Sequence, residues 1–178
     1  LALPASGRAL SVRVTIPNDS LSDTLSLDEC NLTLPIPDHL EGFTDLSGRW
    51  GLEFQSQGHS LTQIEYSREN RTGRSSHRGA ASVIVHETPL SESQGQALAC
   101  HLAWSGNHRV RIEQLTDGRR YCQLGELLAP EEIVLLPGTT YSSPTVWCVF
   151  SSEGLSGLSR QWHRLIREQF PTVAGLQH

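Results

Sequence analysis

The sequence predicts an all-β protein, an antiparallel sandwich of two sheets followed by one C-terminal α-helix. Two observations support this fold class. Along most of the chain, short segments alternate apolar and polar residues between Gly, Pro, Asn, Asp or Ser, which is typical of strands with one face in water. Only near the C-terminus do apolar residues recur at three- and four-residue steps, as in an amphipathic helix. The predicted strands are residues 10–16, 21–27, 30–35, 50–55, 62–67, 82–86, 97–104, 109–114, 121–128, 132–136 and 145–151.

The clearest strand lies in the middle of the chain. In RVRIEQL, which begins at residue 109, Val110 and Ile112 are expected to face the core. Arg109, Arg111 and Glu113 are expected to face water, because side chains alternate along a strand. Asp117-Gly118 separates this strand from the next and can adopt positive φ, so it predicts a hairpin turn. The polar stretch 69–80 (ENRTGRSSHRGA) predicts a long exposed loop.

The helix is expected over residues 155–170, after a sandwich over residues 1–154 and before a tail over residues 171–178. Ser156 or Ser159 can cap its N-terminus. Its apolar stripe consists of Leu155, Leu158, Trp162, Leu165, Ile166 and Phe170. This stripe must pack either on the sandwich or on a partner domain.

Composition argues against several classes of protein. The 178 residues suffice for one domain with a core, and 19 acidic against 14 basic side chains give a net charge of −5. This balance argues against nucleic-acid binding. No apolar run reaches the ~18 residues of a membrane span. Four cysteines outside any CxxC motif are expected to be buried reduced thiols, which suits a cytoplasmic protein. They are Cys30, Cys100, Cys122 and Cys148.

Patterns for catalysis are weak throughout the chain. The adjacent acids Glu131 and Glu132 would point to opposite faces of a strand, so they do not form a catalytic pair. Ser75-Ser76-His77 is a local polar cluster rather than a triad, and no GxSxG or HExxH motif occurs. His163, inside the helix, is expected to be packed or hydrogen-bonded. We therefore expect no catalytic residue, no metal and no cofactor.

Carbohydrate binding is a stronger hypothesis, because sugars are held by aromatic faces beside polar side chains. SGRW (47–50) and WSGN (104–107) offer these residue types at turns. Trp50, Trp104 and Asn107 are therefore candidates for substrate binding. The alternative is that each tryptophan fills the core beside a turn, with its indole N–H bonded to a partner.

Five motifs occur in one order along the chain. They are LSGRW (46–50), GRSSH (73–77), LAWSGNHRVRIEQL (102–115), LPGTTYSSP (136–144) and SSEGLSGLSRQWHRLIRE (151–168). Together they resemble the N-terminal, non-catalytic β-supersandwich domain of bacterial α-galactosidases of glycoside hydrolase family 36. The resemblance covers residues 10–170 and implies a galactose-mutarotase-like supersandwich.

The resemblance also implies what this chain would lack. Enzymes of the family continue into a (β/α)8 barrel that carries two catalytic aspartates. With them they hydrolyse terminal α-linked galactose from melibiose- and raffinose-type sugars with retention of configuration. No catalytic residue can be carried over to this chain. Because it also has no initiator methionine, we expect it to be a piece of such an enzyme.

The implied partners are the enzyme's own catalytic barrel and further copies in a homo-oligomer. Ser105-Gly106-Asn107 is expected to be a turn that shapes the sandwich. The arginines of two motifs are expected to form ion pairs or interfaces. Structural or interdomain roles are thus expected for Arg49, Arg74, Ser105, Gly106, Trp162 and His163.

Three hypotheses about function follow. An accessory domain of an α-galactosidase would be inactive alone, with an exposed apolar patch along the Leu158, Trp162 and Leu165 face or one sheet. An independent carbohydrate-binding module would bind galactose or raffinose through Trp50 or Trp104. A mutarotase-type isomerase would need a positioned histidine and glutamate, and no such pair is evident.

Overall fold

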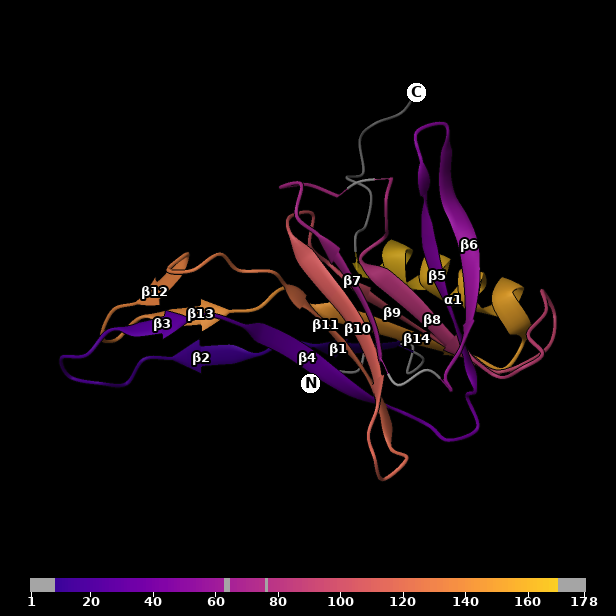
Figure 1. Cartoon of the computed structure of the whole chain (residues 1–178), viewed down its shortest axis with the longest axis horizontal. Coiled ribbons are helices and arrows are strands. Elements are labelled where there is room, and N and C mark those ends of the chain that lie inside the picture. The colour runs from indigo at the N-terminus through magenta and orange to yellow at the C-terminus, as the bar shows by residue number, and fades with distance from the viewer. Residues whose placement is uncertain (1–8, 63–64, 76, 170–178) are drawn as a thin grey trace.

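The computed structural model describes residues 9–62, 65–75 and 77–169, which form fourteen strands and one helix (Figure 1). The strands are β1 (Ala9–Val12), β2 (Thr15–Pro17), β3 (Leu25–Leu27), β4 (Cys30–Ile36), β5 (Gly42–Arg49), β6 (Leu52–Ser60), β7 (Glu65–Asn70), β8 (Ser82–His86), β9 (Ala97–Leu102), β10 (His108–Gln114), β11 (Arg120–Glu126), β12 (Ile133–Leu135), β13 (Thr140–Ser142) and β14 (Val146–Ser151). The helix, α1, spans Gly154–Gln169.

Two antiparallel sheets face each other, as the alternation predicts. The six-stranded sheet has the order β1-β14-β9-β8-β5-β6, and the four-stranded sheet has the order β4-β11-β10-β7. The Asp117-Gly118 hairpin joins β10 to β11, with Gly118 at a φ of 87°. The predicted fold class, an all-β antiparallel sandwich with one C-terminal helix, is confirmed.

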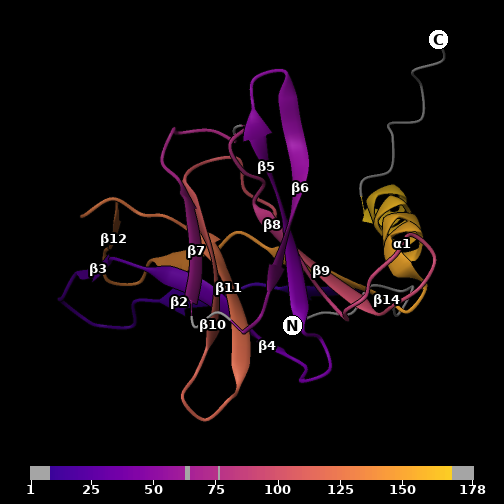
Figure 2. The ribbon, with the colours of Figure 1, turned by 45° about the vertical axis from the view of Figure 1, so that its right-hand side comes forward.

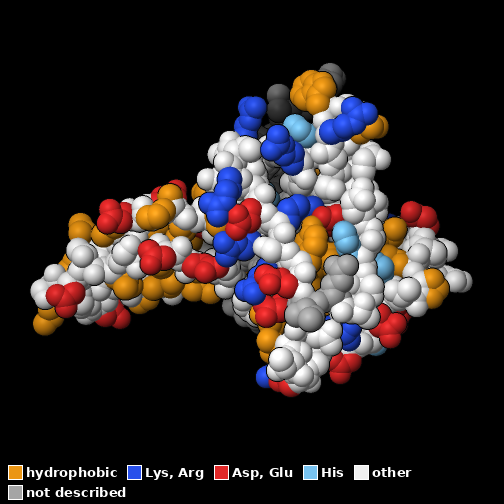
Figure 3. Space-filling view, in the orientation of Figure 1, with side chains coloured by type: hydrophobic (Ala, Val, Ile, Leu, Met, Phe, Trp, Pro, Cys, Tyr) orange, Lys and Arg blue, Asp and Glu red, His pale blue; other side chains and the backbone are white. Residues whose placement is uncertain are grey.

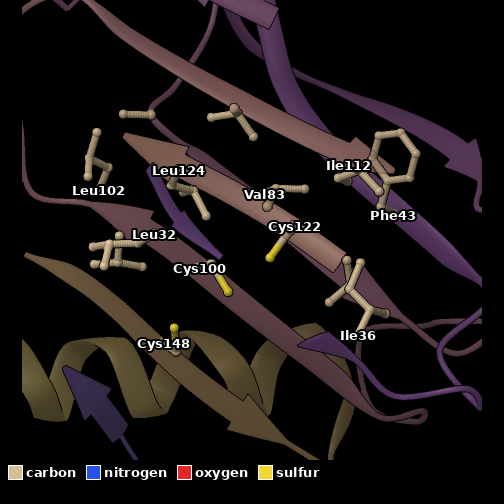
Figure 4. Packing of buried hydrophobic residues seen from close by; sticks show 14 of the residues in the cluster. Leu32, Ile36, Phe43, Val83, Cys100, Leu102, Ile112, Cys122, Leu124 and Cys148 are labelled. Carbon is tan, nitrogen blue, oxygen red and sulfur yellow. The ribbon is translucent and has the colours of Figure 1, made fainter. Parts of the chain in front are cut away.

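The main core lies between the two sheets (Figure 4). Val110 and Ile112 of β10 are buried there, as predicted from the alternation. The charged side chains that alternate with them form ion pairs on the outer face, where Arg109 contacts Glu69 and Glu29 at 2.8 Å. All four cysteines are buried free thiols, which confirms that prediction. Three of them, Cys100, Cys122 and Cys148, lie together in this core.

Helix α1 packs on the outer face of the six-stranded sheet (Figure 2). Leu158 and Leu165 are buried against Ala97 and Val149 of that sheet, because the apolar stripe of the helix faces it. Leu158 and Leu165 of the stripe therefore pack on this chain's own sheet, while Trp162 is only half-buried.

The predicted serine caps of the helix are wrong. Helix α1 begins at Gly154, before both serines, and the hydroxyl of Ser156 contacts Glu92 instead. The amides of the first turn bond to the loop before β9, with Leu155 N donating to Ser91 O at 3.1 Å. A long-range backbone contact replaces the local cap. Residue 170 and the tail over residues 171–178 lie outside the described residues.

Four short strands form an arm, residues 14–29 and 127–143, that extends away from the sandwich (Figure 1). Within it, β2 pairs with β13 and β3 pairs with β12. A small core around Leu27, Leu135 and Tyr141 holds these ladders together. The arm is therefore an ordered part of the structure.

Some strands differ from prediction. Strand β5 was not predicted, because two glycines and the buried Asp45 hide its alternation. Strand β13, three residues long, was also missed. The predicted strand over residues 50–55 begins only at Leu52, after a turn in which Gly51 has a φ of 77°. The segment 21–27 pairs only in its last three residues, because most of it forms a loop of the arm.

Candidate functional site

The Trp104–Asn107 turn joins β9 to β10 and is held by its own atoms. The indole N–H of Trp104 donates to Asn107 O at 3.1 Å. A Cβ at Gly106 would lie 2.7 Å from Trp104 Nε1, so only glycine fits under the ring. The ring is nevertheless 42% exposed, so Trp104 does not fill the core.

The same turn is bonded to the loop that follows β7. The side-chain oxygen of Asn107 accepts a hydrogen bond from Gly73 N at 2.8 Å, and the Ser75 hydroxyl contacts Ser105 O at 3.3 Å. The WSGN and GRSSH motifs therefore meet in space although about 30 residues separate them. Asn107 and Ser105 thus join the turn to this loop, while their expected roles stay predictions.

His108 follows this turn and is buried at the start of β10. Its ring Nδ1 lies 3.0 Å from Gly106 O. Burial lowers the pKa of His108. The hydrogen bond to Gly106 raises this pKa in part, and the charge of Arg68 lowers it again, so that the pKa is lowered overall. Folding thus favours the neutral form of this ring.

Trp50 lies at the end of the β5–β6 hairpin and is 82% exposed. An open hollow of about 620 Å³ lies beside it, lined also by Phe54, Arg74 and His77. Neither Trp50 nor Trp104 fills the core, so the core-filling alternative fails for both. Their part in sugar binding stays a prediction.

Arg74 lines this hollow and Arg49 directly precedes Trp50 in the chain; both arginines are exposed. No ion pair or side-chain hydrogen bond of either guanidinium occurs within the described ranges 9–62, 65–75 and 77–169. The expected ion pairs are therefore absent there, and the interface role of the two residues stays a prediction.

A second concave surface lies between α1 and the six-stranded sheet. It is an apolar groove of about 530 Å³, lined among others by Ile84, Trp147, Trp162 and Ile166. Trp162 is half-buried and meets the ring of His101 edge-on, with centroids 6.1 Å apart. Burial lowers the pKa of His101, and the charge of His108 contributes. We call this surface the helix groove.

His163 does not share this environment. It is exposed on the far side of α1, and no hydrogen bond of its ring is found in the part of the chain that the structure describes. The expectation that it would be packed or hydrogen-bonded is therefore wrong. The helical repeat explains this, because the residue after Trp162 points about 100° away from the groove.

Buried carboxylates are the groups that a glycosidase would use, and two occur among the described residues. Asp45 accepts hydrogen bonds from the Tyr66 hydroxyl and from Arg68. Glu126 accepts one from the Tyr141 hydroxyl. Burial raises the pKa of Glu126, and the nearby charge of Glu132 adds to it. Each carboxylate is engaged by a tyrosine in a different hydrophobic cluster, which indicates structural roles.

These buried networks were missed by sequence analysis. The signal for Asp45 was a single acid within a poorly alternating segment, and its partners lie on another strand, β7. Phe54, which shares the hollow of Trp50, was expected only as a strand residue. In the described part of the chain, no cluster of three or more metal-ligating side chains occurs, and no helix is long and apolar enough to cross a membrane.

The fold is a two-sheet antiparallel sandwich carrying a helix, with an apolar groove and a hollow beside an exposed tryptophan on its outside. The profile described as "Glycosyl hydrolase family 36 N-terminal domain" matches residues 3–136. The chain belongs to this family. The resemblance read from the five motifs is therefore confirmed.

Curated relatives are named as α-galactosidases. The chain is 42% identical to an α-galactosidase of Escherichia coli over 138 residues, which cover 78% of this chain and 20% of the relative. It is 31% identical over 157 residues to a probable α-galactosidase G of Emericella nidulans, covering 86% of this chain and 21% of the relative. The chain thus spans about a fifth of the length of these relatives.

Solved structures agree with this placement. The family 36 α-galactosidase AgaA of Geobacillus stearothermophilus matches with a TM-score of 0.82 and 25% identity, over 90% of this chain and 22% of AgaA. The galactosidase domain of the α-galactosidase-sucrose kinase AgaSK matches with a TM-score of 0.81, also at 25% identity and with the same coverage. Variants of AgaA have been solved with stachyose and with raffinose.

Proposed function

We propose that this chain acts as the non-catalytic N-terminal domain of an α-galactosidase. The catalytic part of that enzyme hydrolyses terminal α-linked galactose from melibiose- and raffinose-type oligosaccharides. It does so with retention, using two aspartates that lie outside this domain. The names of the relatives and the sugars bound by AgaA support this substrate class. The engagement of Asp45 and Glu126 by tyrosines supports a non-catalytic role, because retention requires two carboxyl groups about 5–5.5 Å apart.

The helix groove is the observation that carries this proposal. Its walls are two tryptophans and aliphatic side chains, and Ile166 at its rim is 50% exposed. An apolar groove left open to water marks a contact with another part of a protein. We assign it to the catalytic domain, so the role of this domain is to support that partner.

A chimera tests this role. The segment of the E. coli relative that aligns with this chain would be replaced by this chain, and hydrolysis of p-nitrophenyl α-galactoside would be measured. We expect the chimera to be active and the 178-residue chain alone to be inactive. Ile166→Asp, which places a charge at the groove rim, should reduce the chimera's activity or stability.

Gln169→Asp is the matched control, because Gln169 is exposed on the same helix and does not line the groove. It should leave the chimera unchanged. Activity of the isolated chain would refute the proposal. Equal behaviour of the two variants would show that the groove is not the docking surface.

Sugar binding by the domain itself is the second candidate function, and the exposed Trp50 favours it. An amide NMR titration of the chain with galactose and then raffinose tests it. Saturable shifts near Trp50 that Trp50→Ala abolishes would establish a sugar site. No shifts at concentrations of about 10 mM, well above typical Kd values for specific sites, would exclude it.

The proposed domain also supports assembly of subunits and works in the cytoplasm. Four buried free thiols support the cytoplasmic location, because a reducing compartment keeps such cysteines unpaired. Exposed Arg49 and Arg74 beside Trp50 support the subunit-assembly role, since arginine and tryptophan are enriched at the centres of interfaces.

A further inference from the structure

A third concave surface lies at the end of the sandwich away from Trp50. It is an open hollow of about 900 Å³, and it is lined from within residues 38–44, 58–62, 86–88 and 114–120. The last of these segments includes the turn between β10 and β11, which reaches beyond the lower edge of the sheets (Figure 1). Figure 3 shows histidine, acidic and basic side chains close together at the lower right of the sandwich. We call this surface the polar pocket.

The walls of the polar pocket mix donors and acceptors of hydrogen bonds. Of the fifteen described residues that line it, twelve have polar side chains, and the others are two glycines and Leu61. Three carboxylates stand against two guanidinium groups, so opposite charges nearly balance. The charged residues are Asp38, Glu41, Asp117, Arg119 and Arg120.

This composition favours an uncharged ligand rich in hydroxyl groups. An apolar ligand needs walls of apolar and aromatic side chains. An anion such as phosphate needs an excess of basic groups, whereas acids outnumber arginines here. A metal ion needs several ligating side chains close together, and no group of three or more occurs among residues 9–62, 65–75 and 77–169. A hydroxyl can donate to the carboxylates and accept from the guanidinium groups.

Hydrogen bonds within the protein hold the walls of the pocket in place. The Arg120 guanidinium donates to Asp38 O at 2.6 Å and to Leu40 O at 3.2 Å, which ties β11 to the turn before β5. On β5, the hydroxyl oxygen of Thr44 lies 3.1 Å from Nε2 of His86. Little ordering of these side chains is therefore needed on binding.

His59 of the pocket is held from behind by the buried carboxylate network. Its ring stacks on Phe43, with centroids 4.6 Å apart, and its Nε2 lies 3.6 Å from Asp45. Asp45 is in turn held by Tyr66 and Arg68. A carboxylate that serves no catalytic role thus helps to orient a polar group of the pocket.

We propose that the polar pocket binds a neutral oligosaccharide through its hydroxyl groups. Its volume is near the upper end of the range of about 300–1,000 Å³ that is usual for ligand sites, so more than one sugar unit can enter. The choice of an oligosaccharide rests on the substrate class of the proposed function, whereas the site is argued from its own side chains. The site is separate from the hollow beside Trp50 and shares no lining residue with it.

An amide NMR titration of the 178-residue chain with raffinose tests the site. Concentrations up to about 50 mM cover the millimolar Kd values of weak complexes. We expect saturable shifts at the amides of residues 58–62, 86–88 and 117–120. Trp50→Ala should leave these shifts unchanged, which distinguishes the polar pocket from a sugar site at Trp50. Inorganic phosphate should give no saturable shift there.

Gly58→Leu places a side chain in the pocket. A Cβ at Gly58 would meet no heavy atom within 4 Å, so the strand can accept the substitution while the pocket loses space. Raffinose should bind at least about tenfold more weakly, because the leucine would clash with the sugar. Ser56→Leu is the matched control, since Ser56 is exposed on the same face of β6 and does not line the pocket. It should bind raffinose as the unchanged chain does.

Glu41→Gln removes a charged acceptor with little change of shape. It should weaken raffinose binding about tenfold, as the loss of a hydrogen bond to a charged group does. Glu168→Gln, at an exposed position of α1, is its control.

Three results would overturn the proposal. They are the absence of saturable shifts at the pocket, equal binding by Gly58→Leu and the unchanged chain, and tighter binding of phosphate than of raffinose. None of them alters the expected activity of the chimera, which depends on the helix groove. The site and the proposed function can therefore fail separately.

Discussion

At the scale of single residues, the turn at 104–107 is a junction between two motifs. Trp104 covers Gly106, while Asn107 reaches across to Gly73. One amide side chain thus fixes the position of a loop that lines the hollow of Trp50. A residue chosen as a sugar ligand from sequence turns out to have a bonding partner in the protein.

Asn107→Ala should release that loop. The loss of one hydrogen bond is expected to lower the free energy of unfolding by about 0.5–1.5 kcal/mol. Exchange of the Gly73 amide with solvent should accelerate, while the amides of β10 keep their protection. Hydrogen exchange followed by NMR measures both. Unchanged exchange at Gly73 would show that the contact does not hold the loop.

His108 makes stability depend on pH. Its pKa is lowered by burial in the folded state, so the unfolded chain takes up a proton more readily, with a pKa near 6.5. The stability that the neutral ring provides is complete above that value, and it is lost as the pH falls towards the lowered pKa.

Urea unfolding at about pH 7.5 and pH 5.5, on either side of the ordinary histidine pKa, measures this effect. We expect the unchanged chain to lose stability at the lower pH, and His108→Gln to reduce that loss. His163→Gln, at an exposed position, is the control and should retain the full loss. An equal loss in all three proteins would rule out His108 as its source.

At the scale of elements, the apolar stripe of helix α1 positions the helix on the six-stranded sheet. Leu158 and Leu165 bury against the sheet, whereas Ile166, one residue further along the chain, stands at the rim of the groove. Packing on the sheet, rather than a serine cap, fixes where the helix begins, since its first amides bond to the loop before β9. The helix is thus an integral part of the sandwich.

Leu165→Ala should therefore be costly and Ile166→Ala should not. Removing a buried leucine leaves a cavity and lowers the free energy of unfolding by about 2–5 kcal/mol. The half-exposed isoleucine should cost clearly less, below about 1.5 kcal/mol. Chemical denaturation monitored by tryptophan fluorescence compares them. Similar losses would indicate that the helix does not pack through this stripe.

At the scale of the whole molecule, the interior of the sandwich is packed, whereas parts of its surface expose apolar side chains. Its core, buried carboxylates and thiols are all enclosed, while the helix groove, the arm and the end of the β5–β6 hairpin each present apolar side chains to water. A domain that spans about a fifth of its relatives' length fits this picture, because the centre of a contact between parts of a protein is enriched in apolar side chains.

A fluorescent apolar dye should detect the open groove. We expect 8-anilinonaphthalene-1-sulfonate to bind the isolated chain, and Ile166→Asp to weaken this binding. The chimera with the catalytic part of the E. coli relative should bind less dye per domain, because the partner covers the groove. Near-UV circular dichroism controls for loosened packing, which also attracts this dye. Equal binding by chain and chimera would contradict a covered groove.

Much of the fold was predictable because it depends on local pattern. Alternation identified β8 and β10, and the helical repeat identified α1, which begins one residue before its predicted start. Strand β5 was missed because its pairing with β6 and β8 compensates for a sequence with two glycines and a buried acid. The pairing partners of a strand lie far along the chain, so its own residues do not reveal them.

The sequence by itself determined the fold class, the buried thiols and the family, because each rests on periodicity or on the order of short motifs. Only the tertiary structure decided which surfaces remain open. It buried Asp45 and Glu126 against tyrosines, laid the apolar stripe of α1 on the sheet, and left Trp50 exposed at the end of the β5–β6 hairpin. Burial depends on what long-range strand pairing brings together, and no local segment of the chain contains that information.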